Sequence, residues 1–309
     1  MSVIDALAPG SHNICIDGVE QCYHVAGQGP LCIVHPGGPG VDWAYLKMPE
    51  VELHLTILYI EPIGTGGSGR LPEHPEGYNV ERYSHQLEGL VDALDLTDFF
   101  LLGHSHGGLV IQQYALTHPD RVAGVIVYGS SAVVGAELLK AAGQNILAFA
   151  QREAGLPEAD EVVQAWRSIP SAVSDEVYTQ TLRRLLPACF ADYRRADVAY
   201  RQLRSSLRAT FVVGDDKPFD VRKTLQNLSI PALVLAGAHD FICGPKWAEI
   251  LHAALQGSQL VVFQLSGHMI HVEQPVAFAG VISAFVFRNR NSRRRRRSSR
   301  NSKVIRLLN

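Results

Sequence analysis

Short apolar runs alternate along this chain with amphipathic stretches. Residues 31–34, 55–60, 99–102, 122–128, 230–236 and 259–263 are nearly continuous apolar segments of strand length. Segments of this kind are typical of strands that are buried on both faces of a sheet. Residues 13–25 carry a different pattern, in which the Asp17-Gly18 turn separates two alternating segments and predicts a hairpin.

Helical periodicity fills the intervals between these strands. Residues 79–96 place Leu87, Leu90 and Leu94 on one face and begin with Asn79, a suitable N-cap. A last helix is predicted over residues 275–287. Strands that alternate with helices predict an α/β fold, with a mostly parallel central sheet, right-handed crossovers and flanking helices.

The alternation stops between residues 133 and 226. This stretch holds helical segments at 136–152, 159–167 and 175–185, and its one candidate strand is 210–213. We therefore predict a hydrolase-like core from residues 1–132 and 227–287, a helical cap (lid) at 133–226, and a separate tail at 288–309.

Composition fits a soluble protein with a sizeable core. Of 309 residues, 47% are apolar and 19% are charged, and no run of 18 apolar residues indicates a membrane helix. The first residues lack the basic and apolar regions of a secretory signal. An odd, dispersed set of cysteines fits a reducing compartment, so a cytoplasmic location is expected. These cysteines are Cys15, Cys22, Cys32, Cys189 and Cys243.

Charge is unevenly distributed. From Arg288 to the end there are ten basic and no acidic residues, which leaves 18 basic against 30 acidic residues in the rest of the chain. Such a tail is able to bind nucleic acid or an anionic membrane. Its low complexity instead favours a disordered extension unrelated to catalysis, so neither partner is expected. The oligomeric state is left open.

The pentapeptide Gly103-His104-Ser105-His106-Gly107 carries the clearest chemical signal. It has the form Gly-x-Ser-x-Gly and lies between the apolar run 99–102 and a helical stretch that begins near residue 106. A strand, a sharp turn with serine at its apex and a helix together form a nucleophile elbow. Ser105 is therefore the predicted nucleophile.

A serine hydroxyl needs a base and an acid to become nucleophilic. Asp240 follows the run 230–236, and His268 follows the run 259–263, which gives the order Ser105, Asp240, His268 that this architecture requires. His271 is the rival base, but Gly267 gives His268 the more mobile loop. The predicted catalytic residues are thus Ser105, Asp240 and His268.

Acyl transfer also needs two donors for the developing oxyanion. We predict the backbone N–H of His106 and that of Gly38, with Gly37 as the alternative, in the loop 35–40. His104 and His106 flank the serine, but no further ligands lie at recognisable spacing. No metal or cofactor is expected, and the expected partner is a small-molecule substrate.

With these residues in place, the chain resembles an α/β-hydrolase of the prolyl aminopeptidase-like group over about residues 12–287. The resemblance rests on the loop 35–40, the Gly-Thr-Gly-x-Ser-Gly stretch at 64–69, the elbow, and Asp240 with the segments 267–268 and 271–275. Pro36 stands where the group has histidine, and Glu61-Pro62-Ile63-Gly64 replaces its Asp-x-Arg-Gly pattern.

The cap also departs from the group, because Trp166 is its one tryptophan and the motif that accompanies amine-binding glutamates is not recognisable. Glu137, Glu153, Glu158 and Glu161 are among the glutamates available there. We therefore expect hydrolysis of an apolar carboxylic ester or lactone, with a prolyl aminopeptidase-like activity as the alternative. The chain also looks similar to esterases of the group that open macrolide lactones and confer antibiotic resistance.

Overall fold

An eight-stranded sheet forms the centre of the molecule. In the computed structural model, which describes residues 6–215 and 217–306, the strand order is β1-β2-β4-β3-β5-β6-β9-β10. The first two strands and the β2–β4 pair are antiparallel, and the other neighbours are parallel. The predicted α/β fold is therefore confirmed. The strands are β1 (Gly10–Ile16), β2 (Val19–Ala26), β3 (Leu31–His35), β4 (Thr56–Ile60), β5 (Phe99–His104), β6 (Val122–Tyr128), β9 (Ala232–Gly237) and β10 (Gln259–Phe263).

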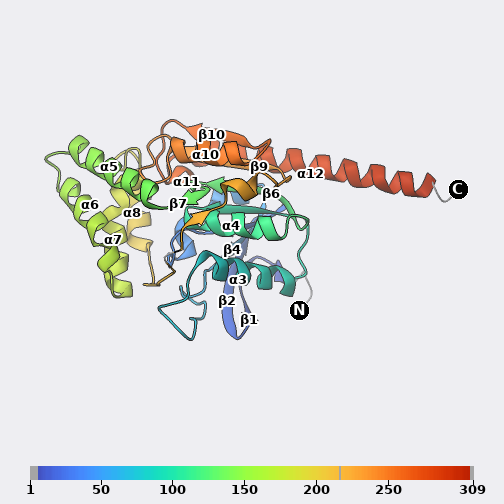
Figure 1. Cartoon of the computed structure of the whole chain (residues 1–309), viewed down its shortest axis with the longest axis horizontal. Helices are drawn as coiled ribbons and strands as arrows, with labels where there is room; N and C mark the ends of the chain where they lie inside the picture. The colour runs from blue at the N-terminus through green and yellow to red at the C-terminus, as the bar shows by residue number, and fades with distance from the viewer. Residues whose placement is uncertain (1–5, 216, 307–309) are drawn as a thin grey trace.

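Helices cover both faces of this sheet (Figure 1). One face packs against α3 (Val80–Ala93), α4 (His106–Thr117) and α10 (Pro245–Ala254), and the short α9 (Arg222–Leu225) joins them. The other face packs against α2 (Pro49–Glu52) and the first part of α12 (Pro275–Arg306). Because both faces are covered, the central strands are apolar along their whole length, which is the pattern that predicted them.

The turn and the helix cap that the sequence predicts are both present in the structure. Asp17 and Gly18 both have positive φ, 49° and 80°, and close the β1–β2 hairpin. The Asn79 side chain accepts a hydrogen bond from the Arg82 N–H at 2.9 Å and caps α3.

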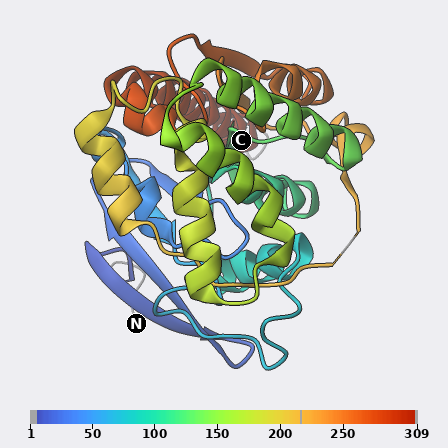
Figure 2. The same cartoon turned by 90° about the vertical axis from the view of Figure 1, so that its left-hand side faces the viewer.

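The lid is inserted between β6 and β9. It consists of α5 (Ala136–Arg152), α6 (Pro157–Ser168), α7 (Asp175–Leu185) and α8 (Asp197–Ser206), with short 3-10 turns at Ile169–Ser171 and Leu186–Cys189. In Figure 2 these helices face the viewer and cover one end of the core. Two-residue strands, β7 (Val133–Val134) and β8 (Phe219–Asp220), pair at its base. Residues 210–213 form no strand, and their neighbour Ala209 makes only an isolated bridge to Val41.

The basic tail differs from expectation. The last helix continues past residue 287 to Arg306 and projects from the body (Figure 1), so the expected disordered extension is wrong for residues 288–306. Arginine is a good helix former, and the packed first turns of α12 supply the nucleus, so elongation needs no new nucleation. Residues 307–309 lie outside the described part. No helix within residues 6–215 and 217–306 has the length and apolar character needed to cross a membrane.

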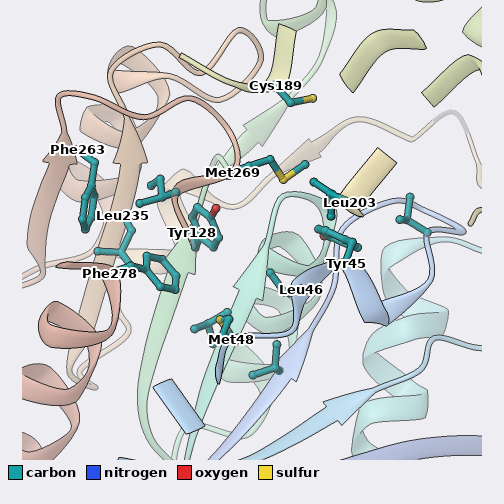
Figure 3. Close-up of a cluster of buried hydrophobic side chains, with 14 of the residues drawn as sticks. Tyr45, Leu46, Met48, Tyr128, Cys189, Leu203, Leu235, Phe263, Met269 and Phe278 are labelled. Atoms are coloured by element: carbon teal, nitrogen blue, oxygen red, sulfur yellow. The ribbon is translucent and has the colours of Figure 1, made fainter. Parts of the chain in front are cut away.

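A hydrophobic cluster joins the sheet to the lid. At one end, Phe263, Leu235 and Phe278 fill the space between the sheet and α12, while Met269, Cys189 and Tyr45 lie toward the lid (Figure 3). This cluster therefore packs the lid onto the same end of the sheet at which β5, β9 and β10 finish. The predicted functional residues follow these three strands.

Candidate active site

Ser105 occupies a strained turn between β5 and α4. Its φ is 53° and its ψ is −121°, a conformation that non-glycine residues rarely adopt. The turn is tight because a Cβ added at Gly103 would come 2.3 Å from the Gly107 carbonyl oxygen. One added at Gly107 would meet the His35 carbonyl oxygen at the same distance. The glycines of the pentapeptide thus permit the close approach of strand and helix that raises Ser105 above the sheet.

Asp240 and His268 form a buried hydrogen-bonded pair. The His268 Nδ1 and Asp240 Oδ2 atoms are 2.7 Å apart, and the two residues are 6% and 5% exposed. The other carboxylate oxygen, Oδ1, accepts the N–H groups of Ile242 and Cys243 at 2.9 and 3.0 Å. A carboxylate only accepts, so the proton of His268 sits on Nδ1 and its Nε2 is free to act as a base.

Ser105 and His268 line one cavity of about 130 Å³ beneath the lid. No hydrogen bond between the Ser105 hydroxyl and the His268 ring occurs in the described residues; such contacts often tighten only when substrate binds. The structure therefore brings the predicted acid and base into contact and places the predicted nucleophile at the same cavity. Asp240 also borders a hollow of about 520 Å³ that does not include Ser105.

The rival base, His271, is committed elsewhere. Its Nδ1 is 3.0 Å from the Tyr128 hydroxyl and its Nε2 is 3.0 Å from the Tyr45 carbonyl oxygen. Burial lowers the pKa of His271 to about 4, and the residue is not part of the Ser105 cavity. This geometry favours His268.

A second buried histidine supports the loop of His268 from behind. His104 Nε2 lies 3.1 Å from the His268 carbonyl oxygen, so Nε2 must carry the proton and Nδ1 must accept. The Tyr45 hydroxyl, 2.6 Å from that Nδ1, is then the donor. Burial, together with neighbouring His268 and His271, holds the pKa of His104 well below its usual range, which keeps the ring neutral.

Tyr45 also bears on the choice of oxyanion donors. Its hydroxyl oxygen accepts the Gly37 N–H at 2.7 Å, so this N–H is already occupied. The N–H groups of Gly38 and His106 have no hydrogen-bond partner among the residues that the structure describes. Gly38 lines the Ser105 cavity, and His106 begins α4, whose N-terminus favours negative charge. The pair Gly38 and His106 therefore suits the predicted role better than Gly37.

The walls of the cavity are apolar and come mainly from the lid and the loops beside it. They include Val41, Leu182, Leu185, Leu186, Leu207 and Ile242. Tyr178, Leu182 and Leu185 come from α7, Leu186 and Cys189 from the 3-10 turn that follows it, and Tyr45 from the segment after β3. No spacing rule identifies them, because they meet Ser105 only through the packing of the lid. All the lining residues fall in the described part, and none is Asp, Glu, Lys or Arg.

Comparisons with known proteins agree with this architecture. A family model described as the alpha/beta hydrolase fold matches residues 30–275. A 2-hydroxy-6-oxo-2,4-heptadienoate hydrolase of Pseudomonas putida is 27% identical over 273 residues, covering 87% of this chain and 93% of that protein. A proline iminopeptidase of Saccharolobus solfataricus is 25% identical, covering 86% and 87%. The solved structure of an enol-lactonase from Burkholderia xenovorans superposes with a TM-score of 0.65 at 22% identity, covering 89% of this chain and all of that one.

Proposed function

The chain belongs to the alpha/beta hydrolase family, and we propose that it is a serine hydrolase which cleaves an uncharged carboxylic ester or lactone with a small apolar acyl group. The observation that carries this proposal is the neutral, apolar lining of the cavity at Ser105. Hydrolase relatives support the general class of reaction. The bond and the substrate are inferred from the cavity itself.

Charge distinguishes the possible substrates. A proline iminopeptidase acts on a free amino terminus, which calls for a carboxylate, and a dienoate hydrolase acts on a carboxylate, which calls for a cation. The cavity offers neither, since its described lining contains no charged Asp, Glu, Lys or Arg side chain. Glu153, the buried glutamate of the lid, is already paired with Arg152 and Arg194. Burying an unpaired substrate charge here is unfavourable, so a neutral ester or lactone is favoured.

In the proposed reaction each of these residues has one role. Ser105 Oγ attacks the carbonyl carbon while His268 Nε2 takes its proton, and Asp240 stabilises the imidazolium through Nδ1. The Gly38 and His106 N–H groups stabilise the oxyanion. His268 returns the proton to the leaving alcohol, which leaves an acyl-serine, and a water activated in the same way releases the acid.

Size limits the acyl group. A volume of about 130 Å³ equals roughly four water molecules in the liquid, and lid residues line one side of it. Only a few carbon atoms fit under the lid as it lies here. A macrolactone ring is far larger, so it would bind only with α7 displaced from the Ser105 cavity.

A panel of p-nitrophenyl esters with acyl chains of 2, 4, 8 and 12 carbons, simple lactones and proline p-nitroanilide tests the proposal. We expect turnover of the two shortest esters, weaker turnover of the longer ones, and none of the anilide. A fluorophosphonate probe should label the wild-type protein at Ser105. Mass spectrometry of the labelled peptide identifies the modified residue.

Ser105→Ala is the matched control, because it removes only the reactive oxygen. It should lose labelling and at least about 10³-fold in kcat. Hydrolysis of the proline anilide without ester turnover would replace the proposal by the aminopeptidase. Labelling at another residue would overturn the assignment of the nucleophile.

A further inference from the structure

One carboxylate bridges the loop of His268 and the lid. Glu273 Oε2 accepts the Gly267 N–H at 2.6 Å, and its Oε1 accepts the Ala191 N–H at 2.8 Å. Gly267 directly precedes His268, while Ala191 lies in the lid just after the turn Leu186–Cys189. A single side chain on α11 (Ile270–Glu273) thus holds two segments about 75 residues apart in the chain.

The two segments are also in direct backbone contact. The His268 N–H donates to the Cys189 carbonyl oxygen at 2.7 Å. A Cβ added at Gly267 would come 2.6 Å from that oxygen and 2.9 Å from the Phe190 carbonyl carbon. No side chain fits between them, so the position of the lid segment 189–191 and that of the His268 backbone are set together.

This lid segment reaches the Ser105 cavity as well, because Cys189 is part of its wall. A shift of the segment would therefore change both the cavity and the placement of the imidazole. Tyr128 and His104 hold the His268 carbonyl oxygen from the opposite side. Glu273 is the one carboxylate among the described residues that receives an N–H from each of the two segments.

Glu273 has no ion-pair partner in the described residues. The groups around it are Asp192 and Arg195 from the lid and His239 from the loop after β9, which share a hollow of about 440 Å³ with it. His271, which lies on the same helix as Glu273, contacts Tyr128 instead. Burial raises the pKa of Glu273 to about 7, against the lowering effect of the neighbouring N–H groups.

We propose that Glu273 is a positioning residue of the reaction, which holds the His268 backbone and the lid segment 189–191 in the arrangement that turnover requires. The inference rests on the proposed role of His268 as the base. The carboxylate accepts both N–H groups, whereas the amide of a glutamine replaces one acceptor by a donor. Loss of one bond lets the two segments separate and misplaces the imidazole.

Glu273→Gln tests this role, with Glu153→Gln as the matched control. Glu153 is also a buried carboxylate that holds the lid, but it pairs with Arg152 and Arg194 and does not contact the His268 loop. With p-nitrophenyl butyrate we expect kcat of Glu273→Gln to fall by about 10–100-fold with a smaller change in KM. The control should stay within about twofold of wild type in kcat even where its Tm falls.

The pH dependence of kcat supplies a readout that general destabilisation does not change. The wild-type kcat should change as the pH passes about 7, where Glu273 titrates, and Glu273→Gln should lack this component of the pH profile. Glu153→Gln should keep the wild-type profile.

Hydrogen exchange at the Gly267 and Ala191 amides, measured in a Ser105→Ala background, is independent of turnover. Glu273→Gln should accelerate exchange at both amides by at least about tenfold, and Glu153→Gln should not. If the wild type is active, a Glu273→Gln variant with an unchanged kcat overturns the positioning role. Unchanged exchange at both amides in Glu273→Gln overturns it as well. Absence of ester and lactone turnover in the wild type overturns the proposed function instead.

Discussion

Replacement of Ser105 by glycine should stabilise the protein while it abolishes catalysis. Ser105 has φ 53° and ψ −121°, so its Cβ is held in a region that is rarely populated by residues with side chains. Glycine adopts this conformation without steric conflict, whereas alanine keeps the Cβ and its strain. The pair Ser105→Gly and Ser105→Ala therefore isolates the strain from the loss of the hydroxyl.

The expected size follows from two opposing effects. A residue in such a region stores about 1–3 kcal/mol, which glycine releases. Glycine also gives the unfolded chain more conformational freedom, which lowers the free energy of unfolding by about 0.5–1 kcal/mol. We expect the glycine variant to exceed the alanine variant by about 1 kcal/mol in the free energy of unfolding, or about 2–3 °C in Tm.

Differential scanning calorimetry of both variants, with ester turnover as a check on the loss of activity, measures this difference. The comparison needs no assumption about substrate, because neither variant turns over. Equal Tm values, or a lower Tm for Ser105→Gly, would show that the turn at residue 105 stores no strain. The elbow would then not be the source of the expected trade-off between stability and activity.

Three further predictions concern the groups behind Ser105. Asp240→Asn should lower kcat by about 10⁴-fold through the wrong imidazole tautomer, with an unchanged circular dichroism spectrum; a loss under tenfold would contradict this. Tyr45→Phe leaves the Gly37 N–H and His104 Nδ1 unpaired, so urea denaturation should give a loss of about 1–3 kcal/mol, and a loss below about 0.5 kcal/mol would argue against the network. Between pH 4.5 and about 7 the folded state holds the Glu273 proton more tightly than the unfolded chain. As the pH rises across this window, the free energy of unfolding of the wild type should therefore fall by about 2–3 kcal/mol relative to that of Glu273→Gln. Parallel curves of free energy against pH for the two proteins would refute the raised pKa.

The core of the fold was predictable because its signals are local. Each central strand is buried on both faces and therefore is an unbroken apolar run, and Asn79 and the Asp17-Gly18 turn act through their immediate neighbours. The course of residues 210–213 was not predictable in the same way. They form no strand, and their backbone bonds go to separate loops, with the Thr210 N–H donating to the Gly40 carbonyl oxygen at 2.8 Å and the Val213 carbonyl accepting the Tyr78 N–H at 3.1 Å. A segment without a strand ladder has no hydrophobic period of its own.

The predicted site likewise combines residues that local signals identify with residues that only tertiary contacts bring in. Ser105, Asp240 and His268 follow from chain order and from their place at strand ends, and the structure lays them around one region of the molecule. Tyr45 hydrogen-bonds to His104, which is 59 positions away in the chain. Glu273 hydrogen-bonds to Ala191, which is 82 positions away. No spacing in a single sequence carries such a contact, because the lid and the loop meet only after folding.

Two departures of this chain from its family pattern, at Pro36 and Glu61, lie outside the lining of the Ser105 cavity. Glu61, in place of the usual aspartate, is 5% exposed and has one carboxylate oxygen 2.6 Å from His24 Nε2, while the other accepts the Gly67 N–H. It thereby holds the glycine-rich stretch 64–69 without the arginine that the family pattern supplies. Neither Glu61 nor Pro36 lines the Ser105 cavity, whose walls come from the lid and its neighbouring loops. The altered motifs therefore say little about which bond is cleaved, and exchange of the lid residues at Leu182 or Leu186 is the change that should alter the preferred acyl chain.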